Sequence, residues 1–407
     1  MSCLRTSLLL AIVTVPAVAA AQPLVEEYLV AGNLGEGERA LQARIDAHPD
    51  DDEARFGLGV VRFLQGVERL GQFLHRQGVN DDLRRLPFLR MPVPPNPDPQ
   101  PTTYADCRKM LETLLADLVE AEATLAKIDG DVKLPIRFGR IRLDLDGNGE
   151  ATDAEALWRL YAVLNQQVSR QEGFEERAKE FRIAFDAGDA YWLRGYCHLL
   201  SALVEIKLAY DGQRWFDHCG HLLFAKTETP FPFLKMDRRP ENREFDTMVF
   251  ADIVAAVHLF DFEIKEPVRM ESARQHLLAM AELSRKSWDA IVAETDDDDE
   301  WLPNPSQQSV VGVAVSAEMI AAWRDVMSEL EALLEGEKLI PFWRDPAQGV
   351  NFKRVFTEPK RFDLVLWIQG TAAIPYLEQG ETVSPESWRG IRQVFRGEFI
   401  GFALWFN

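Results

Sequence analysis

The chain has 407 residues, which is long enough for one large domain or for two or three smaller ones with buried cores. Its hydrophobic content of 47% and aromatic content of 10% are typical of a folded globular protein and argue against a disordered one. There are 65 acidic and 45 basic residues, and the resulting formal net charge of -20 repels phosphate backbones, so we expect no nucleic-acid partner.

The first 21 residues have the pattern of a secretory signal peptide. Arg5 precedes an apolar run at residues 8–15, and the small residues 19–21 favour cleavage before Gln22. The alternative is a buried N-terminal helix. The run is too short to span a bilayer, and no later stretch is long and apolar enough. We therefore expect an exported protein, periplasmic or extracellular, without a membrane span.

Cysteine usage adds little to this assignment. Removal of residues 1–21 leaves Cys107, Cys197 and Cys219, an odd number, so at most one disulfide can form within the chain. The protein is not a small disulfide scaffold.

Two helices are predicted in the N-terminal region, residues 22–86. The first covers residues 36–47, and the second begins after Asp50 or Asp51 and runs to about Gln77. Apolar residues recur in the second helix at spacings of three and four, which predicts one buried face. The small residues Ala54 and Gly59 near Pro49 resemble a junction between tetratricopeptide repeats, which implies closely paired helices within 36–77.

A proline-rich segment follows at residues 87–103. It contains seven prolines and must be extended, either as a linker between domains or as a strap across one domain. The next helix is predicted at residues 105–128, ended by Asp129-Gly130.

Residues 133–145 are predicted to be extended. Apolar residues alternate with other residues there, and the alternation shifts by one position across Gly139-Arg140, which indicates a bulged strand. After this segment, Thr152 and Glu155 have the spacing of a capping box, which predicts a helix leading away from them.

The acidic loop, residues 144–155, reads DLDGNGEATDAE and has a spacing that is specific to one type of metal site. Oxygen-bearing side chains alternate at its start, glycine occupies the sixth place and glutamate the twelfth, so the loop resembles an EF-hand calcium-binding loop. The resemblance implies side-chain ligands at the first, third, fifth and ninth places, a backbone carbonyl at the seventh and a bidentate carboxylate at the twelfth. In chain order, the expected ligands of one Ca²⁺ are therefore Asp144, Asp146, Asn148, Glu150, Thr152 and Glu155.

Two features separate this loop from paired EF-hand sensors. The eighth place, which usually carries a branched aliphatic residue that pairs with a second loop, is Ala151, and no second loop of this spacing occurs in the chain. An unpaired loop that follows a strand resembles the structural calcium loops of dockerin-like modules. A plain Asp/Gly turn capped by Thr152 is the alternative without metal.

The rest of the chain is predicted to be helical, so the fold class is mainly α: helical hairpins packed as a large helical domain, with a short strand-like segment leading into the acidic loop. Residues 104–265 form a helical region that contains this loop, and residues 266–407 form an aromatic-rich helical region, either separate or continuous with it. The individual predictions are a hairpin of 190–210 and 213–226 turning at Asp211-Gly212, helices at 245–262, 272–294 and 316–334, a solvated acidic loop at 296–300, and a last helix from Ser384 whose apolar run 399–406 is docked in the core.

A second candidate metal site lies at His218, Cys219 and His221. Folding of the predicted hairpin would bring Glu205 close to them, and zinc prefers His and Cys ligands. The alternative is that these are ordinary core and interface residues. Well-known catalytic motifs are otherwise missing from the sequence.

These observations favour an exported calcium-binding helical protein that is a binding or scaffolding component of the cell envelope with a protein partner. The alternative function is a secreted or periplasmic hydrolase or metalloenzyme with its site near His218 and His221.

Overall fold

The computed structural model describes residues 23–79, 93–159, 173–235, 247–310 and 314–383. Within these ranges the protein is mainly helical, which confirms the predicted fold class. The predicted signal peptide and the predicted terminal helix from Ser384 lie outside the described residues. None of the described helices is long and apolar enough to cross a membrane.

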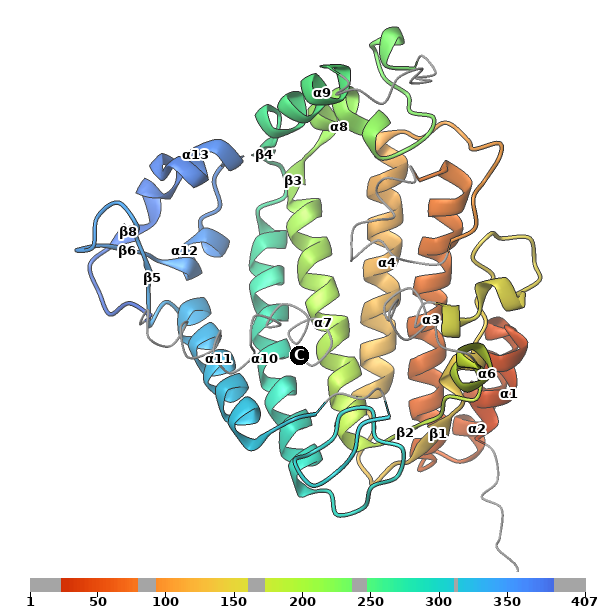
Figure 1. The fold of residues 1–407 in the computed structure, drawn as a ribbon. Helices are drawn as coiled ribbons and strands as arrows, with labels where there is room; N and C mark the ends of the chain where they lie inside the picture. Colours follow the sequence, from red (N-terminus) through yellow and green to blue (C-terminus); the bar gives the residue numbers. More distant parts are fainter. Residues whose placement is uncertain (1–22, 80–92, 160–172, 236–246, 311–313, 384–407) are drawn as a thin grey trace, which may run out of the picture.

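The central feature is a row of long helices, each packed against the next (Figure 1). In order along the row they are α3 (Asp52–Gln77), α4 (Tyr104–Leu125), α7 (Ala187–Ala209), α10 (Val268–Ala293) and α11 (Ala317–Glu335). Two shorter helices, α1 (Leu24–Ala31) and α2 (Leu34–Ala47), pack against α3 at one end of the row.

Side-chain caps explain where several of these helices begin. The Asp51 carboxylate accepts a hydrogen bond from the Ala54 backbone N–H at 2.9 Å, as predicted for the start of α3. Thr103 and Asp106 form a reciprocal capping box at the start of α4. The helix α4 ends at Leu125, three residues before the predicted end.

The remaining elements are short and lie mostly at the ends of the row. The helices are α6 (Phe174–Lys179), α8 (Gln213–Cys219), α9 (Thr247–His258), α12 (Phe352–Thr357) and α13 (Leu364–Gln369). The strands are β1 (Leu134–Ile136), β2 (Ile183–Phe185), β3 (Tyr210–Asp211), β4 (Asp261–Ile264), β5 (Ile340–Pro341), β6 (Gly349–Val350), β7 (Phe362–Asp363) and β8 (Leu377–Glu378). They form three small antiparallel sheets, β1-β2, β3-β4-β7 and β5-β6-β8.

Residues 133–145 contain a strand, as predicted, but the predicted bulge at Gly139-Arg140 is wrong. Strand β1 ends at Ile136, and a 3₁₀ turn at Phe138–Arg140 follows it. The shift in apolar alternation arises from this turn. Gly139 is required there, because a Cβ at this position would lie 1.8 Å from the Ala178 carbonyl oxygen of α6.

The predicted helical hairpin around Asp211-Gly212 is also wrong. Tyr210 and Asp211 are extended and pair with Ile264 and Glu263 of β4, so the chain leaves the row instead of folding back along α7. The next helix, α8, ends at Cys219 and packs against α4 and α9. Cys107, Cys197 and Cys219 are free thiols.

The described part of the proline-rich segment lies against the C-terminal end of α3. The Pro94 carbonyl oxygen is 3.0 Å from His75 Nδ1, and the Gln100 backbone N–H donates to the Arg76 carbonyl at 2.8 Å. Asn96 donates from Nδ2 to the His75 carbonyl at 3.1 Å, so residues 93–100 supply partners to the last turn of the helix.

Candidate metal centre

The acidic loop begins where an alternating segment leaves the core. Ile141, Leu143 and Leu145 are buried in the cluster that also contains the apolar faces of α1, α2 and α3. Asp144 and Asp146 alternate with them and are partly exposed. The apolar residues therefore hold the start of the loop in place and turn its carboxylates away from the core.

The first half of the loop wraps around the Asp144 carboxylate. Its Oδ1 accepts hydrogen bonds from the backbone N–H groups of Gly147 (2.8 Å) and Asn148 (3.0 Å), and its Oδ2 accepts from Gly149 (3.0 Å). Gly147 and Gly149 have φ values of 75° and 90°, a conformation that disfavours other residues. This curvature is the one expected from glycines at the fourth and sixth places.

Glu155 closes the loop from its other end. It is only 1% exposed, and its Oε1 accepts from the backbone N–H groups of Leu145 (2.8 Å) and Asp146 (3.1 Å). Its Oε2 accepts from the Thr152 backbone N–H (3.0 Å) and hydroxyl (2.8 Å). The predicted pairing of Thr152 with Glu155 is confirmed, and one carboxylate joins both ends of the loop.

The element after the loop differs from the predicted helix. A 3₁₀ turn at Asp153–Glu155 comes first, followed by a β-bridge between Ala156 and Arg142, and helical backbone starts only at Leu157. The bridge forms because the chain returns beside the segment that led into the loop. The rest of the predicted helix, residues 160–172, lies outside the described residues.

Three of the six expected ligands converge. Carboxylate oxygens of Asp144, Asp146 and Glu155 lie within 4.8 Å of one another, a spacing that one cation can bridge. Asn148 Nδ2 donates to Asp146 Oδ2 at 3.0 Å, and Thr152 contacts Glu155. This donor set consists of hard oxygen atoms and fits Ca²⁺, with Asp144, Asp146 and Glu155 as the residues that would hold it.

The backbone of Glu150, the expected seventh-place ligand, is part of the same turn. Its N–H donates to Asn148 Oδ1 at 2.7 Å. Asn148, Glu150 and Thr152 therefore form hydrogen bonds within the loop. The oxygens that lie close enough to share one cation belong to the carboxylates of Asp144, Asp146 and Glu155.

Two residues of α3 that the sequence analysis missed hold the loop against the helix row. Glu68 Oε2 accepts from the Asp144 backbone N–H at 2.8 Å, and Gln72 Nε2 donates to the Asp144 carbonyl at 2.9 Å. Burial, together with the nearby charges of Asp144 and Glu155, raises the pKa of Glu68 to about 7. The available signal was a polar pair four residues apart that shares a helix face with the buried Val61 and Leu64.

Ala151 at the eighth place lies against the turn between α1 and α2. A Cβ built on Gly32, whose φ is 72°, would be 2.2 Å from the Ala151 Cβ. The Arg142 backbone N–H donates to the Leu29 carbonyl at 3.0 Å, which fixes the same contact. The position through which paired EF-hand loops join is therefore covered by this chain's own first helices.

A second group of acids, the three-carboxyl cluster, consists of Asp186, Glu294 and Glu300, whose oxygens also lie within 4.8 Å of one another. Burial and the neighbouring Asp186 raise the pKa of Glu294 to about 9, and burial raises the pKa of Glu300 to about 7. Glu300 is only 4% exposed, so the prediction that residues 296–300 form a fully solvated loop is wrong at its last residue.

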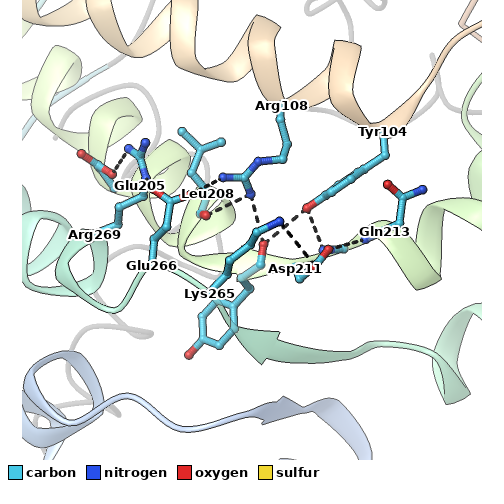
Figure 2. A network of polar contacts seen from close by, with 11 residues as sticks. Tyr104, Arg108, Glu205, Leu208, Asp211, Gln213, Lys265, Glu266 and Arg269 are labelled. Carbon is cyan, nitrogen blue, oxygen red and sulfur yellow. Dashed lines mark hydrogen bonds and ion pairs between the residues drawn. The ribbon is translucent and has the colours of Figure 1, made fainter.

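The residues expected around His218 do not assemble as predicted. Glu205 accepts a hydrogen bond from Arg269 Nη1 at 2.8 Å and belongs to a network of polar contacts at the C-terminal end of α7, shown in Figure 2. His218 Nδ1 is 2.9 Å from the Arg214 carbonyl oxygen, and His221 Nε2 is 3.2 Å from Asp252 Oδ2. The expected meeting of Glu205 with these histidines fails because the hairpin that would bring it about does not form.

The polar network in Figure 2 joins α4 to the end of α7 and to the segment before α10. Arg108 of α4 donates from Nη1 to the Leu208 carbonyl at 3.1 Å and from Nη2 to Glu266 at 2.6 Å. The Gly212 N–H donates to the Tyr104 hydroxyl at 2.7 Å. These contacts satisfy backbone groups where α7 ends and join α4 to the segment before α10.

Comparison with known protein families, with curated proteins and with solved structures found no match in any of the three.

Proposed function

We propose that this chain is an exported, calcium-binding helical protein that acts as a binding or scaffolding component of the cell envelope. In this proposal, Ca²⁺ at Asp144, Asp146 and Glu155 has a structural role. The convergence of these three carboxylates in a loop already closed by Glu155 is the observation that supports it most directly.

The position of the loop favours a structural role over a sensory one. The loop is held by Glu68 and Gln72 on α3, and its eighth place faces Gly32. A sensor needs an element with two alternative arrangements, whereas these contacts fix the loop from two sides. Calcium would then join α3, the α1–α2 turn and the segment after the loop.

Replacement of a chelator by calcium tests the site. At a free calcium concentration ten times the dissociation constant, binding adds about 1.4 kcal/mol to the free energy of unfolding, or a few degrees in melting temperature. Extracellular sites of this type have dissociation constants on the order of 10⁻⁴ to 10⁻³ M, so calcium is titrated up to about 10 mM.

Asp146→Asn is the variant of choice, because the asparagine retains an oxygen that can accept the Asn148 backbone hydrogen bond but removes a charge. It should lose most of the calcium-dependent shift and remain folded. The control, Asp131→Asn, changes an exposed acid outside the loop and should retain the full shift. A wild-type protein that melts at the same temperature with chelator and with calcium would contradict the proposal.

A further inference from the structure

His198 of α7 and His276 of α10 form a pair that the proposed function does not use. Their Nδ1 atoms are 2.8 Å apart, and their ring centroids are 5.1 Å apart. Both side chains are partly exposed, and the pair joins α7 to α10. These two helices lie side by side in the row (Figure 1).

A carboxylate of a third helix orients one member of the pair. Glu122 Oε1 of α4 lies 3.7 Å from His198 Nε2, and Arg194 Nε donates to the same oxygen at 3.0 Å. The negative charge favours the His198 tautomer that carries its proton on Nε2. His198 Nδ1 then has a free lone pair and accepts a hydrogen bond from His276 Nδ1.

Metal-bound histidines commonly have a carboxylate on one ring nitrogen while the other nitrogen binds the ion. Glu122, at 3.7 Å, acts on His198 through its charge. Metals bind imidazole through a ring nitrogen that carries no proton. Glu122 also compensates the charge of Arg194, which would otherwise repel a cation.

We propose that His198 Nδ1 and His276 Nδ1 bind one divalent transition-metal ion of the nickel and copper class between α7 and α10, with Glu122 as a positioning residue. With metal–nitrogen distances of about 2.0–2.1 Å, nitrogens separated by 2.8 Å subtend an angle of about 90° at the ion. Tetragonal and octahedral ions take this angle, whereas a tetrahedral zinc site would require the rings to move apart.

Binding requires a change of tautomer at His276 and a rotation of the rings, because the hydrogen bond points the two nitrogens at each other and a shared ion would lie to one side of the line that joins them. The His276 proton leaves Nδ1 and another is taken up at Nε2 through solvent, so both Nδ1 lone pairs become available with no net change in protonation. Water molecules supply the remaining ligands. The ion would join two helices that otherwise meet mainly through apolar and small side chains.

Calorimetric titration of untagged protein with Ni²⁺ alone tests the proposal, and nickel is chosen because it does not oxidise the free thiols. The wild type should bind one equivalent and melt at a higher temperature with nickel. His276→Gln keeps a hydrogen-bonding group opposite His198 and should weaken binding at least about tenfold, and His198→Ala with His276→Ala should abolish it.

Three further variants make the result specific. Glu122→Gln should weaken nickel binding by about 10–100-fold while one equivalent still binds. His218→Ala with His221→Ala should leave binding unchanged, as should Asp146→Asn in the acidic loop. Circular dichroism checks that each variant is folded. Nickel binding that is equally tight in wild type and in folded His276→Gln would overturn the proposal, as would its loss in the His218/His221 variant alone.

Discussion

The acidic loop and the three-carboxyl cluster gather the same kind of side chain but compensate its charge differently. In the loop, the carboxylates of Asp144 and Glu155 each accept several hydrogen bonds, mostly from backbone N–H groups. In the cluster, Glu294 hydrogen-bonds with Asp186, and the raised pKa of Glu294 means that a proton is held between them at neutral pH.

The difference follows from backbone conformation and burial. Glycines at the fourth and sixth places of the loop turn consecutive N–H groups towards one carboxylate, and such groups stabilise an ionised acid. The cluster lies between the start of α7 and the end of α10, where burial disfavours charge. Asp189 beside it is buried, and its pKa is also raised, first by burial and then by Asp186. An acidic group suited to a cation is thus distinguished from one suited to a proton by its neighbours, not by its composition.

Removal of the Glu155 carboxylate should have the largest effect. Glu155→Ala leaves the N–H groups of Asp146 and Thr152 without their acceptor and removes one of the two acceptors of the Leu145 N–H, at a position where the lost side chain is buried, and we expect a loss of about 3 kcal/mol in the free energy of unfolding. Chemical denaturation in the presence of chelator measures it. Glu150→Ala, an exposed change in the same loop, should cost less than about 0.5 kcal/mol. Equal effects of the two variants would mean that Glu155 does not close the loop.

The contact behind the loop should be next in size. Gly32→Ala places a methyl group against Ala151 and strains a positive-φ backbone, and we expect a loss of about 2 kcal/mol. Gly35→Ala is the matched control, because it has open space around it in α2 and should be neutral or stabilising by about 0.5 kcal/mol. Ala151→Gly added to Gly32→Ala should recover the steric part of the loss. If both glycine variants melt alike, the turn does not hold the loop.

The parts of the site that could be predicted from the sequence are local. Spacing within twelve residues predicted the turn at Gly147 and Gly149 and the pairing of Thr152 with Glu155. The contacts of Glu68 and Gly32 join segments about 75 and 120 residues away from their partners, and nothing in a local pattern identifies such partners.

The same distinction holds for the fold. Caps and apolar spacing predicted α3 and α11 closely, because these signals lie within each helix. The hairpin prediction failed at Asp211 because a strand partner, Glu263, competes with helix pairing there. The sequence predicts a bulge at Gly139 because the contact that requires this glycine involves Ala178, about forty residues later, which a local pattern does not reveal.

The proton held in the three-carboxyl cluster predicts a pH dependence. Because the pKa of Glu294 is about 9 and that of Glu300 is about 7 in the folded protein, the folded state binds more protons than the unfolded chain above the ordinary carboxyl range. Stability should therefore fall as pH rises from about 5 towards 9.

Glu294→Gln, which retains a donor towards Asp186, should make this decline shallower, by a few degrees in melting temperature at pH 8.5. Thermal melts from pH 5 to 9 with chelator measure it. The exposed Glu337→Gln should retain the wild-type slope. A Glu294→Gln slope as steep as that of the wild type would place the extra proton elsewhere.

The smallest effect should come from the cation beside the cluster. Lys133 forms ion pairs with Asp296 and Asp298, and its charge acts to lower the pKa of Glu300. The pairs are exposed, so Lys133→Gln should cost only about 0.5 kcal/mol or less, and added salt should remove the difference.

The informative change is in the position of the pH-dependent decline. Without the Lys133 charge, Glu300 holds its proton to a higher pH, so the decline should begin at the same pH as in the wild type but continue to a higher pH. Lys127→Gln, at an exposed position two residues after α4, removes the same charge from a different place and should leave the decline where it is. If both lysine variants shift it equally, the effect reflects net charge, and the local influence of Lys133 on Glu300 is refuted.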